Sequence, residues 1–265
     1  MARFAALFSG SSGNSTYIGR QGGAGILIDA GVSCKRICSA LADAGADAAK
    51  LRAVFITHEH IDHISGVRVL CKKYHIPLYA AEGTMNALRR KGCLEGGFEA
   101  IVMAPGSGVE LDGIKVVSFR NSHDAASPCG YSVTTPDERK ITVLTDTGVV
   151  TSEAYKAARG SDLILLESNH DEQMLKTGPY DYMLKQRILS DRGHLSNRAG
   201  AEAAVRFVTE GTSRLVLGHV SRENNTPELA FNETNDALMS AGFVPGRDYT
   251  LTVAPPGPSS EMLIF

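Results

Sequence analysis

The chain has 265 residues, of which 43% are hydrophobic and 21% charged, and its formal net charge is −2 at pH 7. This length and composition favour one large α/β domain over residues 1–265 and exclude a disordered or coiled-coil chain. The near-neutral charge gives no global electrostatic reason to expect a nucleic-acid partner, although it is compatible with a local basic surface.

Short apolar runs recur along the chain, bounded by Gly, Asp, Ser or Thr. Their length and β-branched content predict strands, many of them buried. The predicted strands are Phe4–Phe8, Ser15–Ile18, Gly25–Asp29, Ala53–Thr57, Pro77–Ala80, Glu99–Val102, Ile114–Phe119, Cys129–Thr134, Ile141–Thr145, Leu163–Glu167 and Leu215–His219.

Helical patterns lie between these runs. The predicted helices are Ser33–Ala44, Asp62–Tyr74, Gly83–Lys91, Ser152–Arg159, Tyr180–Asp191, Asn197–Thr209 and Pro227–Ala241. This order of elements predicts two packed sheets with helices on the outside.

The five cysteines form no CxxC pair, and their number is odd. This argues against a secreted disulfide scaffold and favours a reducing compartment. The N-terminal apolar run is interrupted by Gly10 and Gly13, and no window approaches eighteen apolar residues. We therefore expect a cytoplasmic protein without a membrane partner.

The most informative segment is Thr57-His58-Glu59-His60-Ile61-Asp62-His63, which follows the apolar run Ala53–Ile56. The spacing of His58 and His60 lets both side chains point the same way from an extended segment. Asp62 and His63 would then begin a helix and point elsewhere. Imidazole nitrogens and carboxylate oxygens suit zinc, manganese or iron, so this turn predicts two ligands for each of two metal ions.

This segment resembles the HxHxDH motif of the metallo-β-lactamase superfamily, which implies a four-layer αββα sandwich. By that resemblance His58 and His60 bind the first metal, while Asp62 and His63 bind the second. The remaining motifs of the superfamily match in order. They imply that Asp29 orients the metal-binding turn, and that the other ligands are His123 for the first metal, Asp146 for both and His219 for the second.

Two such metals would share a water, lower its pKa and stabilise the attacking and leaving oxygens of an in-line displacement. Asp62 or the bridging hydroxide itself would manage the proton. True β-lactamases of the superfamily usually carry Cys at the position of Asp146, whereas phosphodiesterases, lactonases and thioester hydrolases carry Asp. The residue at this position therefore disfavours antibiotic hydrolysis.

Three further segments narrow the choice: a Gly/Ser loop at Ser9–Ser15, a strand end at Leu166–Asp171 and a helix start at Gly193–Asn197. They resemble the YycJ or WalJ type of metallo-hydrolase and, more distantly, transfer-RNA 3′-processing nucleases. In such nucleases the residues that match Glu167 and His194 assist proton delivery to the leaving oxygen. The Gly/Ser loop at residues 9–15 could approach a phosphate through Ser11, Ser12 and Asn14, or could simply form a tight hairpin turn.

Two other polar residues belong to this prediction. We expect His170 to lie behind the ligands, where it would orient them, rather than to act as an extra donor. Ser196 is expected to cap the helix that begins near Asn197 and also to face a phosphate.

The resemblance implies a 5′-to-3′ exonuclease that acts on DNA, more readily than on RNA, by metal-hydroxide attack on phosphorus. The expected cofactors are two divalent ions, Zn²⁺ or Mn²⁺, with iron as a further candidate. Two alternatives stay open: a small-molecule hydrolase of a lactone, thioester or cyclic phosphodiester on the same metal site, and a non-catalytic metal-binding protein. No protein partner can be inferred from the sequence.

Overall fold

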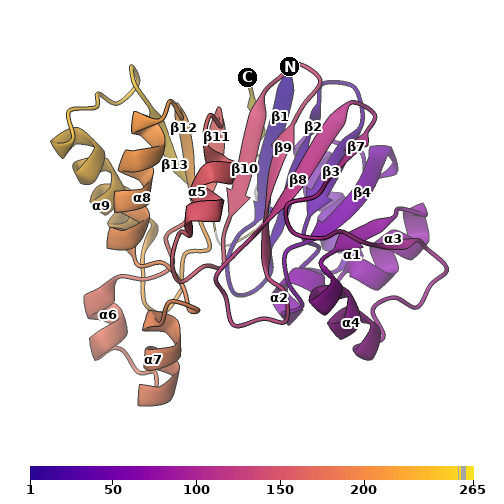
Figure 1. The fold of residues 1–265 in the computed structure, drawn as a ribbon, viewed down its shortest axis with the longest axis horizontal. Coiled ribbons are helices and arrows are strands. Elements are labelled where there is room, and N and C mark those ends of the chain that lie inside the picture. Colours follow the sequence, from indigo (N-terminus) through magenta and orange to yellow (C-terminus); the bar gives the residue numbers. More distant parts are fainter. Residues whose placement is uncertain (256, 258–260) are drawn as a thin grey trace. The chain divides into compact units, whose positions relative to one another are not determined.

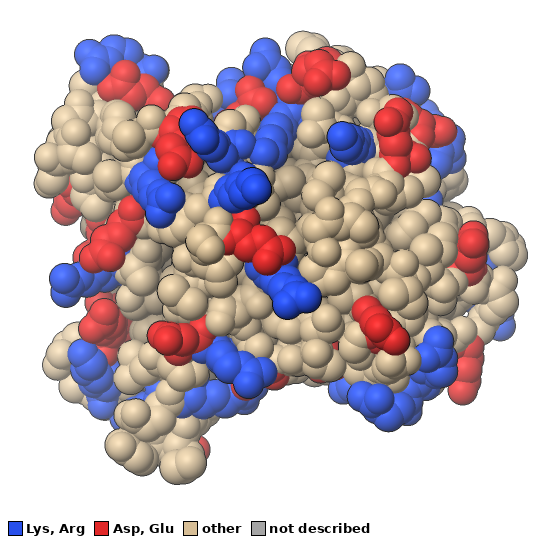
Figure 2. All heavy atoms as spheres, in the orientation of Figure 1, with Lys and Arg blue, Asp and Glu red and all other residues tan. Residues whose placement is uncertain are grey.

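The computed structural model describes residues 1–255, 257 and 261–265, and the chain divides into two compact units. The first unit comprises Met1–Arg120, Ala125–Arg139 and Gly257–Phe265, and the second comprises Asn121–Asp124 and Lys140–Pro256. Both units combine strands with helices (Figure 1). On the face drawn in Figure 2, basic and acidic side chains are interspersed, as the small net charge would suggest. The single domain expected from the sequence stays a prediction.

The first unit is built on a mixed sheet with the strand order β14-β1-β2-β3-β4-β5-β6. The pairs from β14 to β3 are antiparallel, and those from β3 to β6 are parallel. Its strands are β1 (Ala2–Phe8), β2 (Ser15–Arg20), β3 (Gly25–Ile28), β4 (Leu51–Ile56), β5 (Leu78–Ala80), β6 (Ala100–Val102) and β14 (Leu263–Ile264). Because β3 and β4 are parallel neighbours, the residues that follow them meet at one edge of the sheet.

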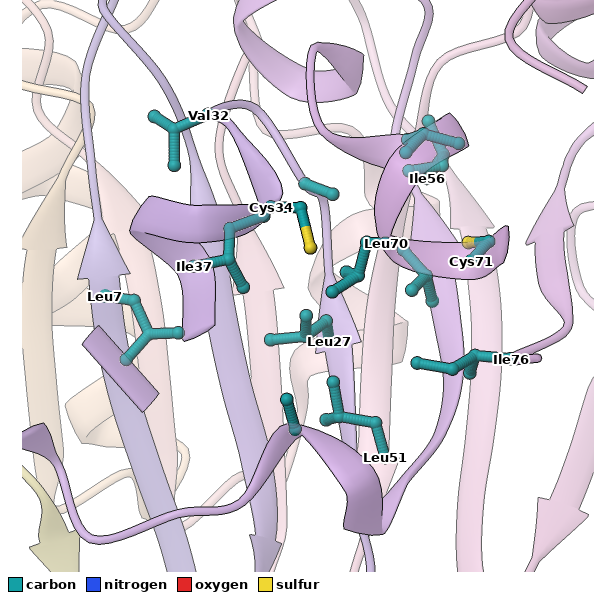
Figure 3. Packing of buried hydrophobic residues seen from close by; sticks show 14 of the residues in the cluster. Leu7, Leu27, Val32, Cys34, Ile37, Leu51, Ile56, Leu70, Cys71 and Ile76 are labelled. Carbon is teal, nitrogen blue, oxygen red and sulfur yellow. The ribbon is translucent and has the colours of Figure 1, made fainter. Parts of the chain in front are cut away.

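The helices of the first unit pack on one face of this sheet (Figure 1). They are α1 (Cys34–Asp43), α2 (Ile61–Ile64), α3 (Val67–Tyr74) and α4 (Glu82–Arg90), and a 3₁₀ turn, η1 (Ala48–Lys50), precedes β4. Figure 3 shows Ile37 of α1 and Leu70 of α3 pointing towards Leu27 of β3, and all three are fully buried. Burial of each such side chain contributes about 1.5–3 kcal/mol, so this core holds the ends of β3 and β4 firmly in place.

Strand β9 (Cys129–Thr134) packs against β4 and pairs antiparallel with β8 (Ile114–Arg120), which pairs antiparallel with β7 (Gly108–Leu111). Tyr131 of β9 packs edge-on against Phe55, with ring centroids 5.5 Å apart, and its hydroxyl donates to Ile56 O at 2.7 Å. The last residues of β4 are therefore buried on both faces, which explains their continuous apolar sequence.

The second unit contains four parallel strands in the order β10-β11-β12-β13. They are β10 (Lys140–Leu144), β11 (Leu163–Glu167), β12 (Arg214–Gly218) and β13 (Thr250–Val253). The helices of this unit are α5 (Ser152–Ala158), α6 (Glu172–Thr177), α7 (Tyr182–Leu189), α8 (Asn197–Thr209) and α9 (Pro227–Ser240). All four strands run the same way, so the residues that follow β10, β11 and β12 also meet at one edge.

One predicted helix is wrong in its extent. The pattern at Asp62–Tyr74 predicts a single helix, but the structure has two, α2 and α3, with a break at Gly66. The N–H of Gly66 donates to Ala30 O at 2.8 Å, and a Cβ on Gly66 would lie 2.1 Å from Val32 O. This close approach to the segment after β3 redirects the chain. The sequence also gave no sign of α6, β7 or β13.

None of the helices described is long and apolar enough to cross a membrane.

Candidate metal centre

The predicted ligands of the first unit follow β4 directly. His58 lies two residues beyond the end of the strand, His60 precedes α2, and Asp62 and His63 lie within α2. His58 and His63 are fully buried, whereas His60 and Asp62 are partly exposed. The turn therefore presents two enclosed imidazoles behind two more accessible donors.

Asp29, which follows β3, contacts this turn. Its Oδ2 lies 2.7 Å from His63 Nδ1, and both of its oxygens accept hydrogen bonds from Thr57, one from the backbone N–H and one from the hydroxyl, at 2.8 Å each. Burial raises the pKa of Asp29, and the contacts with His63 and Thr57 act in the opposite direction. Asp29 thus fixes the ring orientation of one predicted ligand, His63, and the backbone next to another, His58.

These contacts also decide which nitrogen each imidazole offers. The Thr57 hydroxyl donates to Asp29, so its oxygen accepts from His58 Nδ1, 3.0 Å away. His58 and His63 therefore both use Nδ1 for the protein and direct Nε2 elsewhere. His58 Nε2 lies 2.9 Å from His60 Nδ1, and two ring nitrogens at that distance repel unless they share a proton or a cation. This donor set fits a metal ion bound by His58 Nε2 and His60 Nδ1.

Asn14 braces the same turn. Its backbone N–H donates to Asp62 O at 2.7 Å, and its side-chain Nδ2 lies 3.0 Å from His63 Nε2 and 3.3 Å from Asp62 Oδ2. Asn14 is buried, whereas Ser11 and Ser12 on the same loop are exposed. The contacts of Asn14 are those of a residue that orients ligands, and phosphate binding by Ser11, Ser12 and Asn14 stays a prediction.

In the second unit the predicted residues follow three neighbouring parallel strands. Asp146 lies two residues after β10, Glu167 ends β11, and His219 follows β12. Asp146 and His219 each have φ of 56°, in the left-handed region that residues other than glycine rarely adopt. This backbone turns the chain sharply after each strand, and His219 Nε2 lies 3.4 Å from Asp146 Oδ1.

Glu167 occupies the centre of this group. Its Oε1 lies 2.8 Å from Nδ1 of His194 and 2.8 Å from Nδ1 of His219, and its Oε2 accepts from the N–H groups of Thr147 and Leu195. Burial opposes ionisation of this carboxyl, but the two imidazoles outweigh it and hold the pKa of Glu167 below its usual range. Glu167 is therefore an ionised carboxylate whose oxygens are already occupied.

Potential ligand atoms of Asp146, Glu167, His194 and His219 all lie within 4.8 Å of one another, close enough for one metal ion. Since Glu167 Oε1 accepts from two Nδ1 atoms, we assign it to the support of His219 and His194 rather than to direct ligation. His219 then offers Nε2, and Asp146 offers its carboxylate.

His123 joins the same group of the second unit. Its Nδ1 donates to Gly193 O at 3.0 Å, and its ring centroid lies 4.9 Å from that of His194. Burial lowers the pKa of His123, and Asp146 raises it, with the net shift downward. A neutral imidazole with Nδ1 bound to a carbonyl is the form that ligates a metal through Nε2.

His170 and Ser196 lie on either side of a short parallel bridge. His170 is 1% exposed, and within the described part of the chain neither of its ring nitrogens has a hydrogen-bond partner. Burial lowers the pKa of His170 to about 4. Ser196 accepts from Ala199 N at 3.2 Å and caps α8, as predicted. The orienting role of His170 and the phosphate contact of Ser196 stay predictions.

Three supporting residues were missed in the sequence: Thr57, Gly193 and Asn169. Asn169 Nδ2 donates to His219 O at 2.9 Å, and this hydrogen bond helps to hold the left-handed backbone of His219. Thr57 and Gly193 each adjoin a predicted site residue along the chain. That adjacency was the only signal the sequence offered, and it does not reveal which atoms meet.

Comparison with known proteins identifies a family and several relatives. Residues 25–220 match the beta-lactamase superfamily domain. The chain is 41% identical over 249 residues to exodeoxyribonuclease WalJ of Streptococcus pneumoniae serotype 2, covering 93% of this chain and 92% of that protein. It is 36% identical over 251 residues to exodeoxyribonuclease YycJ of Bacillus anthracis, covering 94% and 93%.

Among solved structures, the metallo-β-lactamase fold protein YhfI from Bacillus subtilis matches with a TM-score of 0.72 and 15% identity. The match covers 99% of this chain and 98% of that one. The predicted fold class, the metallo-β-lactamase sandwich, is confirmed.

Proposed function

Because the chain belongs to the metallo-β-lactamase superfamily, and within it to the family of the WalJ and YycJ exodeoxyribonucleases, we propose that it is a dinuclear-metal phosphodiesterase that degrades DNA from the 5′ end. DNA is the proposed substrate because both relatives are named for this activity and align over nearly their whole length. The carboxylate at Asp146, where β-lactamases usually carry Cys, agrees with a phosphodiester substrate.

The observation that carries the proposal is the way in which the histidines are held. His58, His63, His123 and His219 each have Nδ1 bound to an oxygen of the same unit, which fixes the tautomer and leaves Nε2 as the ligand atom. Such support is unnecessary for a surface histidine and is typical of metal sites. We propose that two cations are bound, one by His58, His60, His123 and Asp146, and the other by Asp62, His63, Asp146 and His219.

The donors proposed for these cations are imidazole nitrogens and carboxylate oxygens, with no thiolate among them. This mixture suits Zn²⁺ and Mn²⁺, and also iron. When bound, a pair of divalent cations lowers the pKa of a water molecule and stabilises charge on the phosphate oxygens.

The residues of the chain then divide the proton transfers. Asp62 is partly exposed and is the proposed acceptor of the proton from the attacking water. The side chain of His194 is 19% exposed, and its Nδ1 is held by Glu167, so its Nε2 is the proposed donor to the leaving oxygen. Glu167 is fully buried and does not touch substrate. It acts as a positioning residue that holds the His194 ring through Nδ1 and directs Nε2 outward.

The test is degradation of a duplex DNA that carries a 5′-phosphate and an end label, in Mn²⁺ or Zn²⁺. We expect stepwise loss of nucleotides from the 5′ end, abolished by a chelator and by Asp146→Ala. Asp236→Ala, which removes an exposed carboxylate of α9, is the matched control and should leave the rate unchanged. Intact DNA with a fully metallated protein would reject the nuclease and turn attention to a small lactone, thioester or cyclic phosphodiester.

A further inference from the structure

Helix α7 exposes large apolar residues to solvent in addition to the apolar residues on its inner side. Surface helices normally bury an apolar face and expose a polar one. None of the residues of α7 is buried, and Tyr182 and Met183 are 72% and 74% exposed. Leu189 is a further exposed apolar residue of the same helix. Large apolar side chains gathered in the open indicate a surface that binds something.

The exposed residues form one face. Tyr182, Gln186 and Leu189 follow the spacing i, i+4, i+7, and Met183 lies beside them, three residues before Gln186. Leu184, Lys185 and Ile188, on the opposite side, are partly buried. We call the surface formed by Tyr182, Met183, Gln186 and Leu189 the outer face of α7.

This orientation is fixed by polar contacts. Asp181 accepts from Leu184 N at 2.9 Å and caps the helix. Lys185 Nζ donates to the carbonyls of Lys176 and Gly178 at the end of α6, at 2.9 and 2.8 Å. The helix is thus held with its inner side against α6, and the outer face is left to solvent.

The chain continues from α7 directly to Gly193 and His194, which lie beside the proposed metal ligands of the second unit. His194 N donates to Ile188 O at 3.0 Å, and Gly193 N donates to Ser190 O at 2.8 Å. A Cβ on Gly193 would lie 2.1 Å from Ile188 O, so only glycine allows this close turn. Gly193 O in turn accepts from His123 Nδ1. A partner bound to α7 would therefore lie close, along the chain, to His194, the proposed proton donor, and to Gly193, which contacts His123.

The charges near α7 are mixed, with Asp181 at its N-terminus and Asp191 just after it, but the charged residues of the helix itself are all basic. The helix contains Lys185 and Arg187 and no acidic residue, in a chain whose net charge is −2. Arg187 pairs with Asp124, and Arg192 Nη2 lies 3.4 Å from His123 O. In Figure 2, both basic and acidic side chains lie next to an uncharged projection at the lower left, where Figure 1 draws α6 and α7.

We propose that the outer face of α7 is a platform for the single-stranded end of a DNA substrate. The bases lie against Tyr182 and Met183, while phosphates are bound by Arg187 and Arg192. This combination of exposed apolar or aromatic side chains with nearby cations suits an unpaired strand, because every base has an apolar face and every nucleotide a phosphate. The proposal rests on the proposed function and adds where the strand is held.

The experiment compares the metal-loaded wild type with the double variant Tyr182→Ala/Met183→Ala. The first readout is the Kd for a 5′-phosphorylated, fluorescently labelled single strand with non-cleavable phosphorothioate linkages. The second is the turnover of bis(p-nitrophenyl) phosphate, which is too small to reach the platform. We expect Kd to rise about tenfold or more while turnover of the small ester stays unchanged.

Two single variants sharpen the comparison. Tyr182→Phe keeps the ring and should bind DNA as the wild type does. Met239→Ala removes a side chain of α9 that is 53% exposed, and it should have no effect.

Unchanged DNA affinity in the double variant would overturn the platform. So would sedimentation data in which the wild type is a dimer that the double variant dissociates, because the outer face would then bind a second copy. If the wild type does not cleave unmodified DNA at all, the proposed function fails instead, and the binding comparison still decides whether the platform exists.

Discussion

Oε1 of Glu167 and Nδ1 of His194 lie 2.8 Å apart, and Glu167 is fully buried whereas the His194 side chain is 19% exposed. The same oxygen lies 2.8 Å from Nδ1 of His219. One carboxylate therefore supports the proposed proton donor and a proposed metal ligand together. The two roles can be separated by substitution, because His194 is not among the residues proposed to bind metal.

We expect Glu167→Gln to weaken metal binding about 10- to 100-fold, since His219 loses a charged acceptor, and also to lower kcat. His194→Asn should lower kcat about 10²- to 10³-fold and leave metal binding near that of the wild type. Competition with a chelator measures the first quantity, and DNA degradation at saturating metal measures the second. Equal metal loss in both variants would contradict this division of roles.

A second prediction concerns Asp29. Asp29→Asn keeps the shape but removes the charge that holds Nδ1–H of His63. We expect metal affinity to fall about 10- to 100-fold, with little change in the fold. Asp47→Asn, at the exposed cap of η1, is the matched control. Metal binding by the Asp29 variant as tight as in the wild type would show that the contact is dispensable.

A third prediction follows from the burial of His170. Burial lowers the pKa of this imidazole to about 4, whereas an unfolded histidine titrates near 6.5. Between these values the unfolded chain binds more protons than the native one, so the free energy of unfolding falls as pH falls from about 6.5 towards 4. The contribution lost by pH 5 is on the order of 2 kcal/mol, and it is fully present above pH 6.5.

Urea unfolding of the metal-free protein at pH 7, 6 and 5 measures this effect. A chelator is present throughout, so that metal release does not add its own pH dependence. His170→Asn should flatten the slope of the unfolding free energy against pH, and His75→Asn, an exposed histidine, should not. An equal slope in all three proteins would mean that His170 is not responsible.

The fourth prediction is steric. A Cβ on Gly31 would lie 1.6 Å from Asp62 O and 2.6 Å from Asn14 N, so Gly31→Ala must displace the metal-binding turn. We expect a loss of about 3 kcal/mol in the free energy of unfolding together with weaker metal binding. Gly257→Ala, where no atom lies within 4 Å of the added carbon, is the control. A stable Gly31→Ala protein would show that the turn can shift freely.

The sequence predicted the fold well where residues are buried on both faces. β4 and β11 appear as apolar runs because each is enclosed, and the predicted ligand positions follow from the motifs after these strands. The strands β7 and β13 were missed because every second residue is exposed, so neither shows a continuous apolar run. The short helix α6 has one buried residue, Leu175, and offers no periodicity to detect.

The site was predicted as a set of residues and not as a set of contacts. The phosphate contact of Asn14 stays a prediction, and the contacts of its amide with Asp62 and His63 were not predicted from the sequence. These contacts depend on how β1 and β2 are joined and how Gly31 approaches Asn14, since Gly31 N donates to Asn14 O at 2.8 Å. No local pattern encodes such contacts between distant segments.

The left-handed backbone at Asp29, Asp146 and His219 has a consequence for how this protein could be engineered or could evolve. Each of these residues adopts a backbone conformation that glycine adopts without strain. For a residue with a Cβ atom the strain costs about 1 kcal/mol or more per position. Replacing Asp146 with glycine should therefore yield a protein without metal or activity that melts at a higher temperature than the metal-free wild type. Selection for thermal robustness alone would erode the centre, and retention of a carboxylate or an imidazole at such positions in a relative would itself report that its chemistry is still in use.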